Sequence, residues 1–138
     1  MGIANFEEYK DVFVVADTID DVVHPVTIEL IGQARHIAKE LGQLVQVMLL
    51  GENVQEQAQE LVAYGADIVH VFESPLLKHY STDGYTKVLT DFFKDHKPNV
   101  LLIGATNNGR DLAPRISGRM QNGVVADCTI LTVDTEEG

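Results

Sequence analysis

The stretch Val12-Phe13-Val14-Val15-Ala16 decides how the chain folds, because it is apolar at every position and shows no alternation of polar and apolar side chains. A strand with one face in water alternates, whereas a strand covered on both faces is apolar throughout. This stretch therefore predicts a central strand of a parallel sheet that has helices packed against both faces.

In the rest of the chain, predicted strands and predicted helices alternate. Further apolar segments predict strands at 44–50, 68–72, 100–103 and 128–133. Apolar residues recurring every three or four positions predict helices between them, which are expected at 26–41, 54–64, 85–93 and 109–120. The expected buried face of the second helix includes Val62. The fold class is thus α/β, a doubly wound, mainly parallel sheet of five strands or slightly more, in the order 3-2-1-4-5.

Composition narrows the class of protein. A chain of 138 residues with 45% hydrophobic content is expected to form a single domain, 1–138. Its formal charge of -11 disfavours nucleic acid and anionic membrane surfaces as partners. No apolar run approaches the roughly 20 residues that span a bilayer, so membrane insertion is not expected. A single cysteine, Cys128, and no signal peptide at the N-terminus favour a cytoplasmic location.

In a doubly wound sheet, ligands bind where the strand order reverses, here between the first and fourth strands. The loop 17–21 follows the first strand, and the glycine-containing loop 104–111 follows the fourth. Backbone N–H groups in such a loop hold phosphate or carboxylate, but Thr106 or Asn107 is explained equally well as a helix N-cap. The candidate cofactor-binding residues are Asp17, Gly104, Thr106, Asn107, Gly109 and Arg110.

Three of the four arginines, Arg110, Arg115 and Arg119, lie in the helix that follows this loop. Arg115 and Arg119 are four residues apart on one helix face, where two cations repel each other unless acidic groups or an anion lie opposite. The acids could belong to this domain or to a partner protein, or the anion could be a phosphate.

No set of residues has the spacing of a catalytic or metal site. The five histidines, at positions 24, 36, 70, 79 and 96, show no metal-ligand spacing with Cys128 or with one another. Cys128 opens an apolar strand and is predicted to be a core residue. Asp17, Asp20 and Asp21 could bind Mg²⁺, although a solvated loop is the commoner explanation. We therefore expect no catalytic residue and no metal, and a chain that is not itself an enzyme.

A resemblance to a known family covers nearly the whole chain. Residues 102–115, Leu-Ile-Gly-Ala-Thr-Asn-Asn-Gly-Arg-Asp-Leu-Ala-Pro-Arg, resemble the signature L-I-G-A-T-x-x-G-R-D-L-A-P-R of electron transfer flavoprotein alpha subunits. Segments 29–34, 61–67 and 126–129 are similar to the same family in the same order.

The resemblance implies an N-terminal alpha-subunit domain with an adenine-nucleotide-hydrolase-like fold. FAD would lie mainly in a C-terminal domain that this chain lacks, so no tightly bound FAD is expected here. The implied role is a scaffold that forms a heterodimer with the beta subunit, in a complex that accepts electrons from acyl-CoA or other dehydrogenases. Some relatives hold AMP or a second flavin in the beta subunit, so a nucleotide could contact this domain.

A second hypothesis is a stand-alone adenine-nucleotide-binding domain of the universal stress protein type, since such domains share the strand–helix rhythm and the acidity. It predicts that the isolated chain binds adenine nucleotide at Asp17 and residues 104–109.

Overall fold

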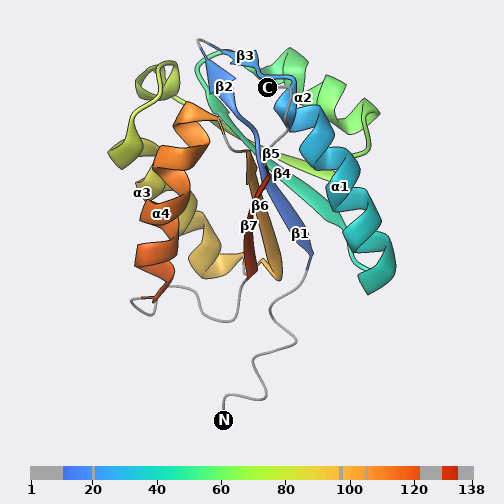
Figure 1. The fold of residues 1–138 in the computed structure, drawn as a ribbon. Coiled ribbons are helices and arrows are strands. Elements are labelled where there is room, and N and C mark those ends of the chain that lie inside the picture. The colour runs from blue at the N-terminus through green and yellow to red at the C-terminus, as the bar shows by residue number, and fades with distance from the viewer. Residues whose placement is uncertain (1–10, 20, 97, 105, 122–128, 134–138) are drawn as a thin grey trace.

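The computed structural model describes residues 11–19, 21–96, 98–104, 106–121 and 129–133 (Figure 1). Within these residues no helix is both long enough and apolar enough to cross a lipid bilayer. The elements, in chain order, are β1 (Val12–Val15), β2 (Thr18–Ile19), β3 (Val22–Val23), α1 (Val26–Leu41), β4 (Val45–Gly51), α2 (Gln55–Ala63), β5 (Ile68–Glu73), the 3₁₀ turn η2 (Pro75–Leu77), α3 (Thr82–Asp95), β6 (Val100–Gly104), α4 (Asn107–Gln121) and β7 (Thr129–Val133).

The main sheet has five parallel strands in the order β5-β4-β1-β6-β7. Val12 of the central strand β1 pairs with Val45 of β4 on one side and with Val100 of β6 on the other. Counted along the chain without the short β2 and β3, this is the order 3-2-1-4-5. The predicted fold class, strand order and switch point are confirmed.

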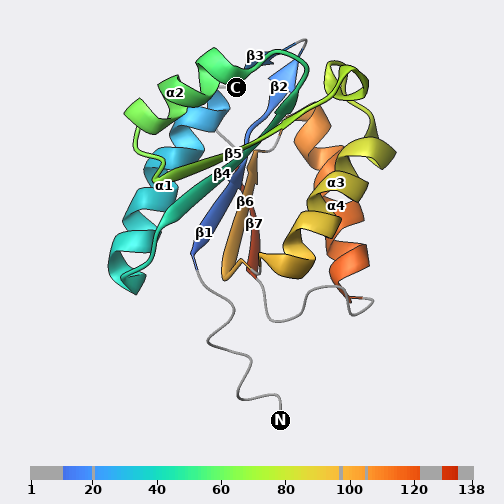
Figure 2. The ribbon, with the colours of Figure 1, turned by 180° about the vertical axis from the view of Figure 1, so that it is seen from behind.

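Helices cover both faces of the sheet, with α1 and α2 on one and α3 and α4 on the other (Figures 1 and 2). Alternate side chains of β1 serve the two layers: Val12 and Val14 pack with α1 and α2, and Phe13 and Val15 pack with α3 and α4. Every residue from Val12 to Ala16 is at most 4% exposed. The continuous apolar stretch therefore reflects burial on both faces.

A short hairpin, β2–β3, was not predicted. It is antiparallel, pairs Thr18 with Val23, and stands at the carboxyl edge of the sheet (Figure 1). Its turn residue Asp21 has a φ of 67°, and its carboxylate accepts hydrogen bonds from the backbone N–H groups of Glu52, at 2.8 Å, and Asn53, at 3.2 Å. Contacts with a loop 31 and 32 residues further along the chain thus hold two strands that are too short to show a period in the sequence.

Helix boundaries differ from the prediction where polar caps decide them. α3 begins at Thr82 rather than at position 85, because the Ser81 hydroxyl accepts a hydrogen bond from the N–H of Gly84. In α2 the predicted burial of Val62 is wrong, since its side chain is 51% exposed and Leu61 alone of that helix is buried.

Candidate functional site

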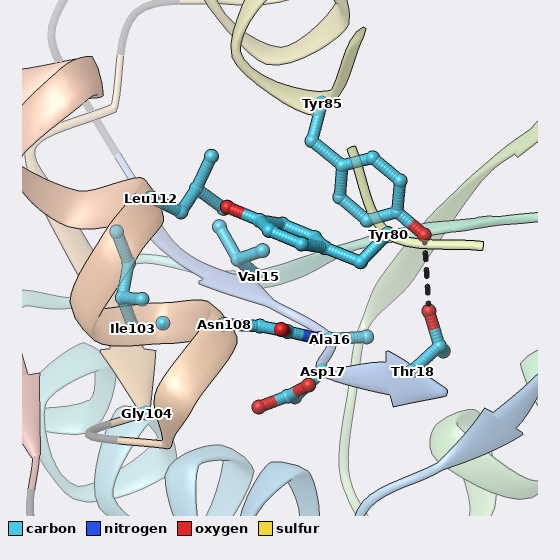
Figure 3. Close-up of a pocket in the computed structure, with 11 residues that line it drawn as sticks. Val15, Ala16, Asp17, Thr18, Tyr80, Tyr85, Ile103, Gly104, Asn108 and Leu112 are labelled. Carbon is cyan, nitrogen blue, oxygen red and sulfur yellow. Dashed lines mark hydrogen bonds between the residues drawn. The ribbon is translucent and has the colours of Figure 1, made fainter. Parts of the chain in front are cut away.

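The strand order reverses between β1 and β6, and the loops after these two strands lie side by side in the structure. The Thr106 hydroxyl donates a hydrogen bond to the Asp17 carboxylate. The N–H of Asp17 in turn donates to Oγ1 of Thr27, at 3.0 Å, which ties the loop to the start of α1. We call the space bounded by these loops, Tyr80 and Tyr85 the switch-point crevice (Figure 3).

Gly104 and Gly109 bring the first turn of α4 against the end of β6. A Cβ atom on Gly109 would lie 1.8 Å from the carbonyl oxygen of Gly104, far inside van der Waals contact. A Cβ on Gly104 would lie 3.1 Å from a methyl group of Val26 on α1. Both glycines are thus explained by close packing of a helix on a strand.

Thr106 caps the N-terminus of α4. Its hydroxyl oxygen accepts a hydrogen bond from the N–H of Gly109, at 3.1 Å, while its hydrogen is directed to Asp17. The positive end of the helix dipole therefore already has a carboxylate beside it, which weakens the attraction for a further anion. Asn107 and Arg110, also predicted as candidates, are exposed at the start of the same helix.

Two tyrosines fill the crevice (Figure 3). Tyr85 is 3% exposed, and its hydroxyl donates to the carbonyl oxygen of Leu77, at 2.9 Å. Tyr80 packs edge-on against Tyr85, with ring centroids 5.0 Å apart. The remaining cavity is about 20 Å³, which is room for about one water molecule. FAD and AMP therefore do not fit between these side chains.

Tyr80, in the loop before α3, and Thr82, the first residue of α3, are both tied to α4 through Asp111. The Tyr80 hydroxyl donates to Oδ2 of Asp111, at 2.9 Å, and the Thr82 hydroxyl donates to the same oxygen. These two hydrogen bonds, that from Thr82 first, hold the pKa of the exposed Asp111 carboxyl below its usual value. Burial, together with the neighbouring Asp111 carboxylate, raises the pKa of Tyr80 to about 12.

The predicted arginine cluster is only partly described. Arg115 forms an ion pair with Asp83 of α3, at 3.5 Å, and both side chains are well exposed. An acid of this domain, Asp83, therefore pairs with one of the three arginines, Arg115. Exposed ion pairs of this kind contribute little to stability. Arg110 is exposed, and the side chain of Arg119 lies outside the described part of the structure.

Among the side chains that the structure describes, no three His, Cys, Asp or Glu residues lie together as metal ligands. Both carboxylate oxygens of Asp21 are occupied by backbone N–H groups, and Asp17 faces Thr106. Asp20 and Cys128 lie outside the described residues.

Sequence reasoning missed the side chains that close the crevice: Thr18, Tyr80, Asn108 and Leu112 line it together with Tyr85. Tyr85 lies at the start of the predicted helix 85–93 and belongs to the buried cluster beneath α3 and α4. The available signal was the unusually long connection before α3, which carries Tyr80, but nothing in the sequence shows which way that loop folds.

The family model for the electron transfer flavoprotein domain matches residues 12–137. An electron transfer flavoprotein subunit alpha of Megasphaera elsdenii is 47% identical over 94% of this chain, and a lactate dehydrogenase (NAD(+),ferredoxin) subunit of Acetobacterium woodii is 48% identical over 89%. The chain spans only 38% and 29% of these two relatives.

A universal stress protein of Archaeoglobus fulgidus has a similar structure, with a TM-score of 0.60 over 90% of this chain and 98% of that one. Its sequence is 14% identical, so this likeness is one of fold alone. The family match and the alpha-subunit relatives agree with the signature at 102–115. The chain belongs to the electron transfer flavoprotein family, as an N-terminal domain of the alpha-subunit type.

Proposed function

We propose that this domain is a scaffold and partner-docking part of a larger cytoplasmic electron transfer flavoprotein, whose FAD is held mainly by another domain and whose second chain is a beta subunit. The observation that carries the proposal is the filling of the switch-point crevice. Tyr80 and Tyr85 leave about 20 Å³ where folds of this class bind ligands, whereas sites for drug-sized ligands measure about 300–1,000 Å³.

The polar groups of the crevice support the same proposal. Asp17 and Thr106 satisfy each other and the N-terminus of α4, so the described residues leave no ring of donors aimed at a phosphate. The domain would then act by holding neighbouring protein, while acyl-CoA or other dehydrogenases deliver electrons to the flavin in the parent complex. The relative from A. woodii, a subunit named for a dehydrogenase, is consistent with that setting.

Calorimetry on the 138-residue chain tests the proposal. FAD, AMP and ATP are titrated into the chain separately, and none is expected to give saturable heat. The chain is then mixed with a beta subunit of the same family, and a one-to-one complex is expected on gel filtration. Two results would contradict the proposal: a purified chain that is yellow because it carries stoichiometric flavin, or a chain that forms no complex with the beta subunit on gel filtration.

The fold likeness to the universal stress protein keeps the stand-alone nucleotide-binding hypothesis as the second candidate. Under that hypothesis ATP or AMP binds the unaltered chain, and Asp17→Ala abolishes binding. Tyr80 would have to leave the crevice, so nucleotide would also break the Tyr80–Asp111 hydrogen bond. An NMR titration that follows Asp111 detects this change directly.

A further inference from the structure

A groove of about 770 Å³ opens between α1 and α2, on the helical layer opposite the switch-point crevice (Figure 1). We call it the α1–α2 groove. Its charged and polar lining residues Arg35, His36, Lys39 and Asp67 are all exposed. Sites for small molecules are mostly apolar and bury most of the ligand. An open, charged groove of this size is better suited to a segment of another protein.

Two cations face the groove in a strongly acidic chain. Arg35 and Lys39 are four residues apart, so they lie on one face of α1, and neither forms an ion pair with a residue that the structure describes. Glu40 follows Lys39 but does not line the groove, because adjacent residues of a helix point in different directions. The acid that does line it, Asp67, accepts a hydrogen bond from the N–H of Val45, at 2.8 Å. The groove therefore favours an anionic occupant.

Arg35 is held in place by a glycine on the opposite wall of the groove. A Cβ atom on Gly65 would lie 2.4 Å from Cδ of Arg35 and 3.0 Å from its Nε, so the arginine lies directly against the backbone. Gly65 has a φ of 125°, which also favours glycine. A side chain that is already positioned loses less entropy when it binds. Arg35 is thus preorganised for a carboxylate, which a guanidinium binds through two parallel hydrogen bonds.

Exposed apolar side chains lie beside the cations, on and around the two turns that lead into β4 and β5. Two hydrogen bonds join these turns: the N–H of Asp67 donates to the carbonyl oxygen of Val45, at 2.9 Å, and the N–H of Val45 donates to Oδ2 of Asp67. Apolar surface that is bordered by polar groups marks protein–protein interfaces, where Tyr and Arg are enriched. Of the seven large apolar residues that are exposed in the described part of the chain, five belong to this region and are 38% to 52% exposed: Leu41, Leu44, Val62, Tyr64 and Ile68.

We propose that the α1–α2 groove and the two turns beside it form a docking surface for a partner protein that presents a segment of carboxylates and apolar side chains. The carboxylates pair with Arg35 and Lys39, and the apolar side chains cover Val62 and Tyr64. A second copy of this chain fits less well. A two-fold contact sets the two cations against the same surface of the other copy, and each copy carries a formal charge of -11. This inference does not depend on the proposed function, because neither flavin nor a beta subunit takes part in it.

Titration with a probe peptide tests the proposal by NMR. The blocked peptide acetyl-Glu-Leu-Glu-Glu-Leu-Glu-amide carries both kinds of side chain, and the same peptide with glutamine in place of every glutamate is its control. At low ionic strength, saturable amide shifts are expected at Gly32, Lys39 and Gly65 and not on α3. Arg35→Gln with Lys39→Gln should weaken binding about tenfold, as should the glutamine peptide. Lys87→Gln, an exposed cation on the other layer, should leave binding unchanged.

The apolar half of the surface has its own variant. Tyr64→Ser should weaken binding of the peptide about threefold, because apolar contact is lost, and should not affect inorganic phosphate. Amide shifts outside the groove report whether each variant is folded.

Four results would overturn the proposal. The groove amides could fail to shift, or their shifts could survive the Arg35 and Lys39 substitutions. Inorganic phosphate could bind as tightly as the peptide, which would make the groove a site for simple anions. Groove amides that shift when the chain alone is diluted would make a second copy the occupant.

Discussion

At the scale of single residues, close backbone approach explains Gly109 better than ligand binding does. Alanine at this position places its Cβ against the carbonyl oxygen of Gly104, so α4 must move off β6. Gly109→Ala should lower the free energy of unfolding by about 3 kcal/mol, at the upper end of overpacking costs. Urea denaturation measures this loss.

Gly118, in the same helix, is the matched control for that substitution. A Cβ there meets no described atom within 4 Å, so Gly118→Ala should raise the free energy of unfolding by about 0.5–1 kcal/mol through helix propensity. Equal effects of the two substitutions would mean that contact with Gly104 does not constrain position 109.

The Asp111 carboxyl is a second residue-scale test, because two hydroxyls hold its pKa down. Thr82→Val should raise that pKa most, and Tyr80→Phe should raise it less. Tyr64→Phe, at the exposed residue just after α2, should not change it. Titration of the carboxyl carbon by NMR measures all three. A Thr82→Val variant whose Asp111 titrates as before would show that the hydrogen bonds do not stabilise the ionised form.

The same shift has a definite sign for stability. A carboxyl with a folded-state pKa below its unfolded value stabilises the fold at pH values above the unfolded pKa, and this contribution disappears as the pH falls through the folded pKa. The variants Thr82→Val and Tyr80→Phe should therefore differ from the unaltered chain near neutral pH and converge with it in strong acid.

At the scale of elements, α3 contains two buried threonines one turn apart, and only one of their hydroxyls makes a hydrogen bond with a described residue. Thr86 is 2% exposed, and its hydroxyl has no hydrogen-bond partner among the residues that the structure describes. The Thr90 hydroxyl, in contrast, donates to the carbonyl oxygen of Thr86, at 2.7 Å. Removing an unsatisfied buried hydroxyl relieves its desolvation cost, so Thr86→Val should stabilise the chain by about 1 kcal/mol.

Thr90→Val serves as the comparison for Thr86→Val, because it makes the same change of side chain at another buried position of α3. It removes a made hydrogen bond, so it should be neutral or should destabilise by up to about 1 kcal/mol. Thermal unfolding of the two variants measures the difference. A destabilising Thr86→Val would mean that its hydroxyl is satisfied in solution.

The elements also show what the sequence could predict. Segments such as Val12–Ala16 are apolar at every position, which predicts burial on both faces. The strands could therefore be predicted from periodicity, and their order from the topology of alternating strands and helices. The β2–β3 hairpin did not, because Asp21 holds it through Glu52 and Asn53 rather than through a local pattern. Topology likewise predicted that Asp17 lies near Thr106, but the closure by Tyr80 depends on Asp111, 31 residues away. Binding of a cofactor by the candidate residues stays a prediction.

At the scale of the whole molecule, the formal charge of -11 makes the stability of the chain depend on salt. Like charges repel in the compact state, and salt screens them with a Debye length of about 8 Å at 0.15 M ionic strength. Salt also weakens the ion pairs that are seen among the described residues, Lys87–Asp91 and Arg115–Asp83. Both pairs are exposed, and such pairs contribute about 0–1 kcal/mol each. Relief of repulsion should dominate, so sodium chloride should raise the melting temperature.

Glu40 and Glu60 give that prediction its control. Both are exposed in the last turns of their helices, α1 and α2, where a negative charge opposes the helix dipole. Glu40→Gln with Glu60→Gln should therefore raise the melting temperature at low salt and reduce its further rise on adding salt, as followed by circular dichroism. A melting temperature that falls with salt in the unaltered chain would mean that attractive charge contacts outweigh the net repulsion.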